Sequence, residues 1–258
     1  MIRFKSLGSG SSGNATVVQA RGGTQLTHLL IDCGLRLRDL DVRLGQSGLL
    51  ADQIDAIFIT HEHGDHLGCA HRLALRERIP IWMSRGTYAA IGEPDFEGLL
   101  RIACDGVDIE LGGLRLRPFT VPHDAREPLQ LICGDGAVRL GILTDLGHAS
   151  NHVMEALAGC ETLLLECNHD AQMLAASSYP AFLKRRVGGD WGHLANDAAA
   201  AIAQAMRPHG LRQLAAAHLS EQNNRPELAR RALAGAMGCD EADIHVADGA
   251  SGCGWLSC

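Results

Sequence analysis

The sequence lacks the features that mark several large classes of protein. No apolar run approaches the roughly 20 residues that a membrane-spanning helix requires. Residues 1–6 contain no hydrophobic segment of a secretory signal peptide, so we expect a cytoplasmic protein with no membrane partner. Linker-like low-complexity stretches and internal repeats are also absent. We therefore expect residues 1–258 to form a single domain.

Paired cysteines and an excess of basic residues are missing as well. The nine cysteines are scattered without a CxxC pair, which argues against a disulfide framework and against a Cys-rich zinc finger. The formal net charge of −7 gives the chain no general attraction to nucleic acid. A nucleic-acid substrate would have to be held by local basic groups and by metal ions. The hydrophobic fraction of 46% and the charged fraction of 21% are typical of a globular protein.

Strand and helix patterns alternate along most of the chain, as periodicity and turn residues indicate. Strands are expected at residues 2–4, 15–18, 29–31, 57–59, 80–83, 108–111, 114–121, 130–133, 138–143, 162–165, 211–216 and 244–246. Helices are expected at residues 36–44, 67–76, 151–158, 196–206 and 226–237. This order predicts an α/β protein in which two β-rich layers are flanked by helices.

Histidines and carboxylates follow the predicted strands. The densest group, His61-Glu62-His63-Gly64-Asp65-His66, comes just after the apolar run at 57–59. Four other strands run into a single such residue, namely His123, Asp145, Glu166 and His218. The carboxyl ends of strands in layered α/β proteins line a common crevice, so we expect these side chains to converge. Imidazole and carboxylate groups in such numbers suit a divalent ion such as zinc or manganese.

The ligand types divide into two groups. The first ion would be bound by three imidazoles, those of His61, His63 and His123. The second would be bound by Asp65, His66 and His218, with Asp145 bridging the two ions. Two neighbouring ions can share a hydroxide and clamp a phosphoryl or carbonyl group. The HExxH zincin motif is excluded, because position 65 holds Asp65 rather than histidine.

The H-x-H-x-D-H motif, together with the isolated His123, Asp145 and His218, resembles the metallo-β-lactamase fold superfamily. The resemblance implies an α/β protein (α+β in some schemes) built as a four-layer αββα sandwich, with a dinuclear metal site at one edge. It also implies that Asp32 supports the metal-binding loop from a second shell instead of binding metal. The superfamily includes lactamases, thioesterases, lactonases, oxidoreductases and nucleases, so the fold does not fix the substrate.

Finer motifs resemble nuclease branches of this superfamily. Glu166 with Gly192-His193 resembles the RNase Z-like branch, which implies that Glu166 orients His193 as the general acid. Residues 6–14, 166–170, 192–196 and 218–224 resemble the YycJ-like (WalJ) subgroup. Members of that subgroup are regarded as nucleases, and 5′-to-3′ exonuclease action on DNA is the implied activity. Ala195 stands where the subgroup usually has serine, which leaves a local hydroxyl contact in doubt.

Candidate substrate contacts are less specific. The three-residue basic run Lys184-Arg185-Arg186 would bind a phosphate backbone, unless it is simply a solvated helix end. The other candidate donors are polar residues of two segments: Ser11, Ser12, Asn14, Asn223 and Asn224. The Gly/Ser-rich segment at 8–14 is either a flexible hairpin or a loop that approaches an anion. No role is predicted for His169.

The sequence therefore predicts a dinuclear metal-dependent phosphodiesterase acting on nucleic-acid ends, with DNA favoured over RNA. A metal-bridging hydroxide would attack phosphorus, and the catalytic residues would be Asp65, Glu166 and His193. The expected cofactors are two divalent ions, zinc first, with manganese and then iron as alternatives. The rival functions are a hydrolase of small esters, thioesters or β-lactams, a metal-stabilised regulatory protein and an iron-loaded redox protein. A homo-oligomer is left open.

Overall fold

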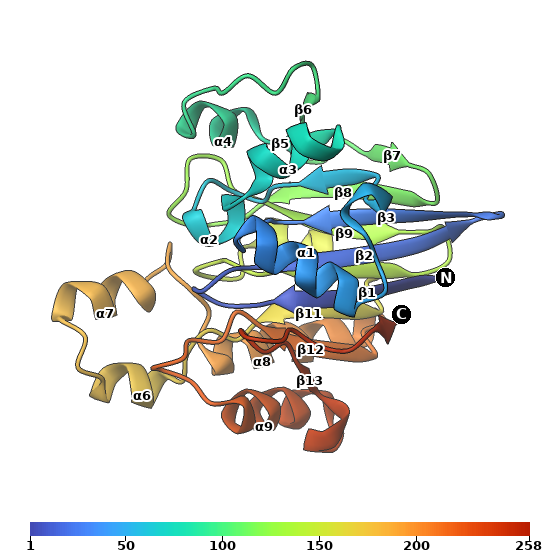
Figure 1. The fold of residues 1–258 in the computed structure, drawn as a ribbon. Coiled ribbons are helices and arrows are strands. Elements are labelled where there is room, and N and C mark those ends of the chain that lie inside the picture. The colour runs from blue at the N-terminus through green and yellow to red at the C-terminus, as the bar shows by residue number, and fades with distance from the viewer.

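The computed structural model describes residues 1–258 and contains two seven-stranded sheets packed face to face (Figure 1). The first sheet has the strand order β14 (Leu256–Ser257), β1 (Ile2–Gly8), β2 (Ala15–Gly22), β3 (Gln25–Ile31), β4 (Ala56–Phe58), β5 (Ile81–Met83) and β6 (Leu100–Ile102). The second has the order β13 (His245–Val246), β12 (Gln213–Ala217), β11 (Thr162–Glu166), β10 (Arg139–Leu143), β9 (Leu129–Gly134), β8 (Leu114–Thr120) and β7 (Ile109–Leu111).

Each sheet is part antiparallel and part parallel. Strands β1 to β3 pair as antiparallel hairpins, whereas β3 to β6 run parallel. Strands β7 to β10 are antiparallel in the second sheet, whereas β10 to β13 run parallel. Parallel neighbours need a crossover connection, and helices supply most of these crossovers. The parallel strands therefore end at one common edge of each sheet.

The helices cover the outer faces of the two sheets or connect the strands at their ends. They are α1 (Leu37–Gln46), α2 (Gly64–Leu67), α3 (Ala70–Glu77), α4 (Arg85–Ala90), α5 (Asn151–Leu157), α6 (Ala171–Ala176), α7 (Ala181–Val187), α8 (Asn196–Met206) and α9 (Pro226–Met237). Short 3-10 helices lie at Ala51–Gln53, Arg207–His209 and Glu241–Asp243. None of the helices combines the length and the apolar character that crossing a membrane requires.

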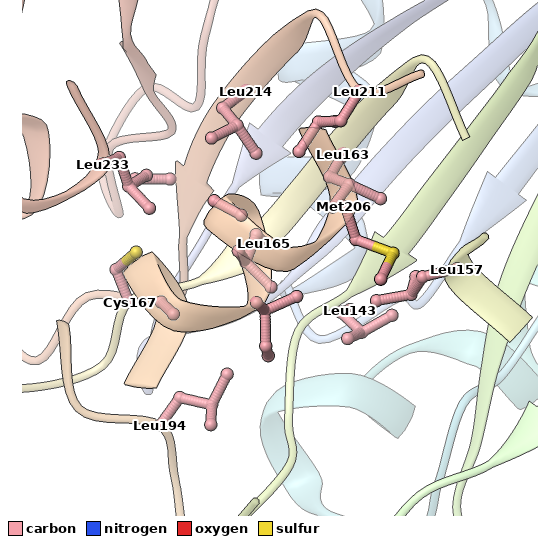
Figure 2. Packing of buried hydrophobic residues seen from close by; sticks show 14 of the residues in the cluster. Leu143, Leu157, Leu163, Leu165, Cys167, Leu194, Met206, Leu211, Leu214 and Leu233 are labelled. Atoms are coloured by element: carbon pink, nitrogen blue, oxygen red, sulfur yellow. The ribbon is translucent and has the colours of Figure 1, made fainter. Parts of the chain in front are cut away.

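Three buried hydrophobic clusters hold the layers together. One lies between the sheets and includes Phe58 of β4 and Leu164 of β11. Another lies outside the second sheet, where Leu163 and Leu165 of β11 pack with residues of α5, α8 and α9 (Figure 2). A third lies outside the first sheet against α1 and α3. Successive side chains of a strand face opposite sides, so β11 serves two clusters, and the predicted αββα sandwich is confirmed.

One predicted helix is wrong. The pattern at 67–76 predicts a continuous helix, but the structure has α2 and α3, separated at Gly68. Gly68 has a φ of +33°, and a Cβ there would lie 2.3 Å from the carbonyl oxygen of Cys33. This close approach joins the loop after β4 to the end of β3. Elements α4, α6, α7, β6 and β14 were not predicted, because all of them are short.

Candidate metal centre

The predicted ligands lie at the edge where the parallel strands end. His61 follows β4, Asp145 follows β10, and Glu166 is the last residue of β11. The register pairs Leu143 with Leu165, and it pairs Glu166 with Ala217, which directly precedes His218. Residues that follow these strands must therefore meet in space. The structure gathers all seven predicted ligands, together with Glu166 and His193, into overlapping groups.

The first group consists of three imidazoles whose ring nitrogens converge. Nε2 of His61 lies 3.1 Å from Nδ1 of His63, and that Nδ1 lies 3.3 Å from Nε2 of His123. A tetrahedral zinc ion with Zn–N bonds of about 2.0–2.1 Å would separate its nitrogen ligands by about 3.3 Å. The spacing of these nitrogens fits one divalent ion bound by His61, His63 and His123.

The second group lies beside the first and contains Asp65, His66 and His218. Oδ2 of Asp65 is 3.7 Å from Nε2 of His66 and 3.5 Å from Nε2 of His218. The Nε2 atom of His218 is buried and has no hydrogen-bond partner. A buried polar atom without a partner is costly, so this nitrogen fits a metal ligand.

Asp145 lies between the two groups. Its Oδ2 atom is 2.8 Å from Nε2 of His66, and its Oδ1 atom is 3.9 Å from Nε2 of His123. Oδ2 is buried, and none of its neighbours has the geometry of a hydrogen bond. A carboxylate with one oxygen toward each group is the chemistry that a bridging ligand needs. The donor set as a whole fits two divalent ions.

The charges of the site favour cations. Burial alone would lower the pKa of His66, but the carboxylates of Asp145 and Asp32 outweigh it and raise the pKa to about 10. Burial likewise opposes a charged His218, yet Asp145 and the other carboxylates raise its pKa well above the usual value. In His61 and His123 burial lowers the pKa, so their imidazoles are neutral. The negative field of the carboxylates would favour metal ions in the same way as it favours protons.

Asp32 supports the loop through Thr60, a residue that the sequence analysis missed. The Thr60 hydroxyl donates to the Asp32 carboxylate at 3.0 Å, and the Thr60 amide donates to its Oδ1 at 2.9 Å. Nδ1 of His66 donates to Oδ2 of Asp32 at 2.7 Å, and Nδ1 of His61 lies 3.0 Å from the Thr60 hydroxyl. These contacts turn Nε2 of both imidazoles toward the site, which is the arrangement a supporting carboxylate gives to ligating histidines.

The backbone is strained at two of these positions. Asp32 has a φ of +61° and His218 a φ of +53°, both in the left-handed region that non-glycine residues seldom adopt. The amide of His218 donates to Oγ of Ser9 at 2.7 Å, so the Gly/Ser-rich segment holds this conformation in place. Strain of this kind persists only where the surrounding contacts fix it, and it is common at functional sites.

His193 and Glu166 are in contact, as the nuclease resemblance implies. Nδ1 of His193 donates to Oε1 of Glu166 at 2.8 Å and lies 3.0 Å from Oδ1 of Asp145. Glu166 is fully buried, and the amides of Leu146 and Leu194 donate to its Oε2. Burial would lower the pKa of His193, but Glu166 and Asp145 raise it to about 9. Glu166 therefore holds His193 in a fixed orientation, and the two carboxylates favour its protonated form.

One side of the cluster is open to solvent. The side chains of His63, Asp65 and His193 are 28%, 25% and 25% exposed, whereas that of Asp145 is 1% exposed. A reacting group can therefore reach a member of each ligand group, His63 and Asp65, and also His193.

The three asparagines that are predicted to contact the substrate lie below the surface. Asn14, Asn223 and Asn224 are all buried. The Asn14 amide donates to the backbone oxygen of Asp65 at 3.2 Å and lies 3.0 Å from Nε2 of His66. Asn224 donates to the backbone oxygen of Cys167 and exchanges two hydrogen bonds with Asn196. The hydrogen bonds of Asn14 and Asn224 therefore join the loops around the site, whereas Oδ1 of Asn223 is buried without a partner.

The remaining substrate candidates lie at the surface. Ser11 and Ser12 are exposed. Lys184 donates from Nζ to the backbone oxygen of Ala175 at 2.6 Å, so its ammonium group binds the end of α6. Nε of Arg186 donates to Oδ2 of Asp124 at 2.6 Å, and Arg185 has no side-chain partner. Arg185 is thus the cation of α7 that remains unpaired, whereas Arg186 is held by Asp124.

Two residues near the site were not predicted. Oδ1 of Asp124 lies 3.5 Å from Nε2 of His123 and 3.8 Å from Nε2 of His63, which links the ligand histidines to Arg186. Its position next to His123 in the sequence was the only available signal. His169 is buried, and its Nδ1 atom has no hydrogen-bond partner.

Comparison with known proteins identifies the family. The family model described as the beta-lactamase superfamily domain matches residues 27–218. The exodeoxyribonuclease YycJ of Bacillus anthracis is 32% identical, and the match covers 96% of this chain and 96% of that protein. The chain belongs to the metallo-β-lactamase superfamily, in its YycJ-like subgroup. As a member of this superfamily it is a metal-dependent hydrolase.

Other relatives agree with this assignment. The exodeoxyribonuclease WalJ of Streptococcus pneumoniae is 28% identical over 95% of this chain and 91% of its own length. The metallo-β-lactamase fold protein YhfI of Bacillus subtilis superposes with a TM-score of 0.76 at 15% identity, over 100% of both chains. At that identity, the likeness to YhfI supports the fold alone.

Proposed function

We propose that this protein is a dinuclear metal-dependent nuclease that removes nucleotides from nucleic-acid ends, as a 5′-to-3′ exonuclease acting on DNA. The relatives that match nearly the whole chain carry the name exodeoxyribonuclease, which supports the substrate class. The observation that carries the proposal is the contact between Glu166 and His193 at the open side of the two ligand groups. A phosphodiester needs a proton donor for its leaving oxygen, and His193 is placed to provide one.

The protein's own groups would act in the following way. His61, His63 and His123 would hold one ion, and Asp65, His66 and His218 the other, with Asp145 between them. When bound, two such ions supply an activated water and the positive charge that a phosphoryl group needs. Glu166 accepts the Nδ1 proton of His193, which leaves the Nε2 proton available for the leaving oxygen. Asp65 would be both a ligand and the carboxylate at the open side of the site.

The test compares the wild-type protein with three variants on end-labelled DNA and RNA oligonucleotides in zinc or manganese. His193→Ala should keep its bound metal and lose activity by about 10²- to 10⁴-fold, because general-acid catalysis contributes that much. Asp65→Ala should lose both metal and activity. His209→Ala, at an exposed histidine of a 3-10 helix, serves as the matched control. Metal content is measured by mass spectrometry for each protein.

Two outcomes would contradict the proposal. In the first, the metal-loaded wild type cuts no single- or double-stranded end of DNA or RNA. In the second, His193→Ala turns over small esters at the wild-type rate, while neither protein cleaves an oligonucleotide. The second outcome would favour hydrolysis of small esters, thioesters or β-lactams. Labels at the 5′ and 3′ ends of the same oligonucleotide would report the direction of cleavage.

A further inference from the structure

Two exposed aromatic side chains lie in the stretch of chain from α7 to His193. Phe182 is 66% exposed and Trp191 is 62% exposed, and they are the only aromatic residues among the large hydrophobic side chains at the surface. Only 4% of the residues in this chain are aromatic. Phe182 belongs to α7, and Trp191 lies in the segment between α7 and His193. Figure 1 shows α6 and α7 extending beyond the sheets on one side of the molecule.

The segment that carries Trp191 is fixed on both sides. The amide of His193 donates to the backbone oxygen of Val187 at 2.8 Å, and the amide of Gly192 donates to that of Gly189 at 2.9 Å. Nδ1 of His148 donates to the backbone oxygen of Asp190 at 2.9 Å, and Nδ1 of His123 to that of Gly192 at 3.0 Å. Trp191 is therefore presented to solvent from a rigid backbone, two residues from the proposed general acid.

Positive charge accompanies the aromatic side chains. Arg185 and Arg186 follow Phe182 by three and four residues on α7, a spacing that makes each of them a neighbour of Phe182 on the helix surface. Arg186 binds Asp124, which contacts the ligand histidines His63 and His123. This part of α7 therefore carries one aromatic and two cationic side chains, and Asp124 links it to the candidate metal centre. We call Phe182, Arg185, Arg186 and Trp191 the aromatic–basic patch.

We propose that the aromatic–basic patch binds single-stranded nucleic acid, with unpaired bases stacked on Trp191 and Phe182 and with Arg185 and Arg186 against the phosphates. This inference rests on the proposed nuclease function and adds that the enzyme selects ends with unpaired bases. A base inside a duplex is stacked on both faces and a blunt terminal pair leaves one face free, whereas an unpaired base can offer both faces to an indole. Aromatic side chains beside a cationic track are the combination with which proteins bind single strands without sequence preference.

Charge favours a nucleic acid over a second protein as the occupant. The whole chain carries −7, so the exposed, unpaired Arg185 together with Arg186, which is paired with Asp124, forms a local exception to its charge. A polyanion whose end is processed at His193 would need such cations next to the site. A second copy of this chain carries only −7 over 258 residues, a much lower density of negative charge than the phosphate backbone of a nucleic acid.

The test measures the affinity of the metal-loaded protein for two non-hydrolysable single-stranded oligonucleotides, one with bases and one abasic. The wild type should bind the oligonucleotide with bases about 5- to 150-fold more tightly, which corresponds to stacking of one base. In Trp191→Ala this preference should shrink toward one, and in Trp191→Phe most of it should return. Phe182→Ala should show a smaller loss. Leu50→Ala, at an exposed apolar residue outside the patch, is the matched control.

The same proteins are assayed for cleavage of single-stranded and blunt duplex ends. In Trp191→Ala the KM for single-stranded ends should rise by a factor similar to the loss of affinity, and kcat should change much less. Equal base preference in the wild type and in Trp191→Ala would overturn the proposal. The proposal would also be overturned if Trp191→Ala changed the oligomeric state, as measured by light scattering, but left the affinity for oligonucleotides unchanged. The patch would then be a contact between subunits. A wild type that cuts no nucleic acid contradicts the nuclease function itself, which is a separate result.

Discussion

At the scale of single residues, the site depends on carboxylates that serve several donors at once. Asp32 accepts from the Thr60 amide, from the Thr60 hydroxyl and from Nδ1 of His66 while it holds a left-handed backbone conformation. Glu166 accepts from His193, His218 and two backbone amides. Each buried charge is thus balanced by hydrogen bonds, as buried ionised groups require. Removing either carboxylate would leave several buried donors without a partner.

Asp32→Asn tests this dependence. Asparagine accepts the left-handed conformation, but its amide offers one acceptor oxygen and a competing N–H group. We expect zinc affinity to fall by about 10- to 100-fold, as second-shell changes commonly produce. The free energy of unfolding should fall by about 1–3 kcal/mol from the unsatisfied donors.

Zinc affinity is measured by competition with a chelator, and stability by urea unfolding. Asp39→Asn, at an exposed carboxylate of α1, is the matched control. Wild-type affinity in Asp32→Asn would contradict the supporting role of Asp32.

At the scale of elements, glycines allow the loops of the site to pack against neighbouring backbone. Gly192 precedes His193, and a Cβ at this position would lie 2.1 Å from the backbone oxygen of Arg186 and 2.3 Å from that of Val187. The carbonyl of Gly192 also orients His123. The turn after α7 therefore positions a proposed ligand and the proposed acid together. A residue with a Cβ cannot stand at position 192 without moving His123 and His193.

Gly192→Ala should lower nuclease activity by about 10²-fold, because a shift of about 1 Å in a catalytic group has effects of that size. The free energy of unfolding should fall by about 1–3 kcal/mol through overpacking.

The control is Gly45→Ala in α1, where an added Cβ would meet no atom within 4 Å. That change should raise stability by about 0.5–1 kcal/mol, since alanine is the better residue in a helix interior. Unchanged cleavage by Gly192→Ala would show that the turn does not hold His193 in place.

At the scale of the whole molecule, five strand ends from both sheets place histidine and carboxylate side chains in one cluster. Strand β4 of the first sheet supplies His61, whereas β8, β10, β11 and β12 of the second lead to His123, Asp145, Glu166 and His218. Ions bound there would connect the two sheets. Bound metal should therefore stabilise the whole fold and not just the loops.

Chelation tests this coupling. Removing metal present at about 1,000 times its dissociation constant should cost about 4 kcal/mol of stability. For a chain of this size we expect a fall in Tm of about 8–16 °C. Calorimetry with and without a chelator measures the change, and added zinc or manganese should reverse it. In His61→Ala the chelator should have a smaller effect, and an unaltered Tm in the wild type would mean that the ligands do not hold metal tightly.

Much of the fold could be predicted from the sequence because periodicity encodes which face of each element is buried. The long elements α1, α8, α9 and β8 were expected within a few residues of their observed ends. The continuous helix across Gly68 was wrong, because a contact with Cys33, distant in the sequence, ends α2 there. The short helices α6 and α7 were missed, because their few residues carry too little periodicity.

The sequence alone indicated the residue types of the site and their places after strands, whereas the pairing of Glu166 with His193 was implied by the family resemblance. Only the tertiary structure decided which polar residues face solvent. It buried Asn14, Asn223 and Asn224 and exposed Trp191 beside His193. The physical reason is that residue type and periodicity are local properties. Exposure at a strand end depends on loops from elsewhere in the chain, and their packing is settled only when both sheets close on each other.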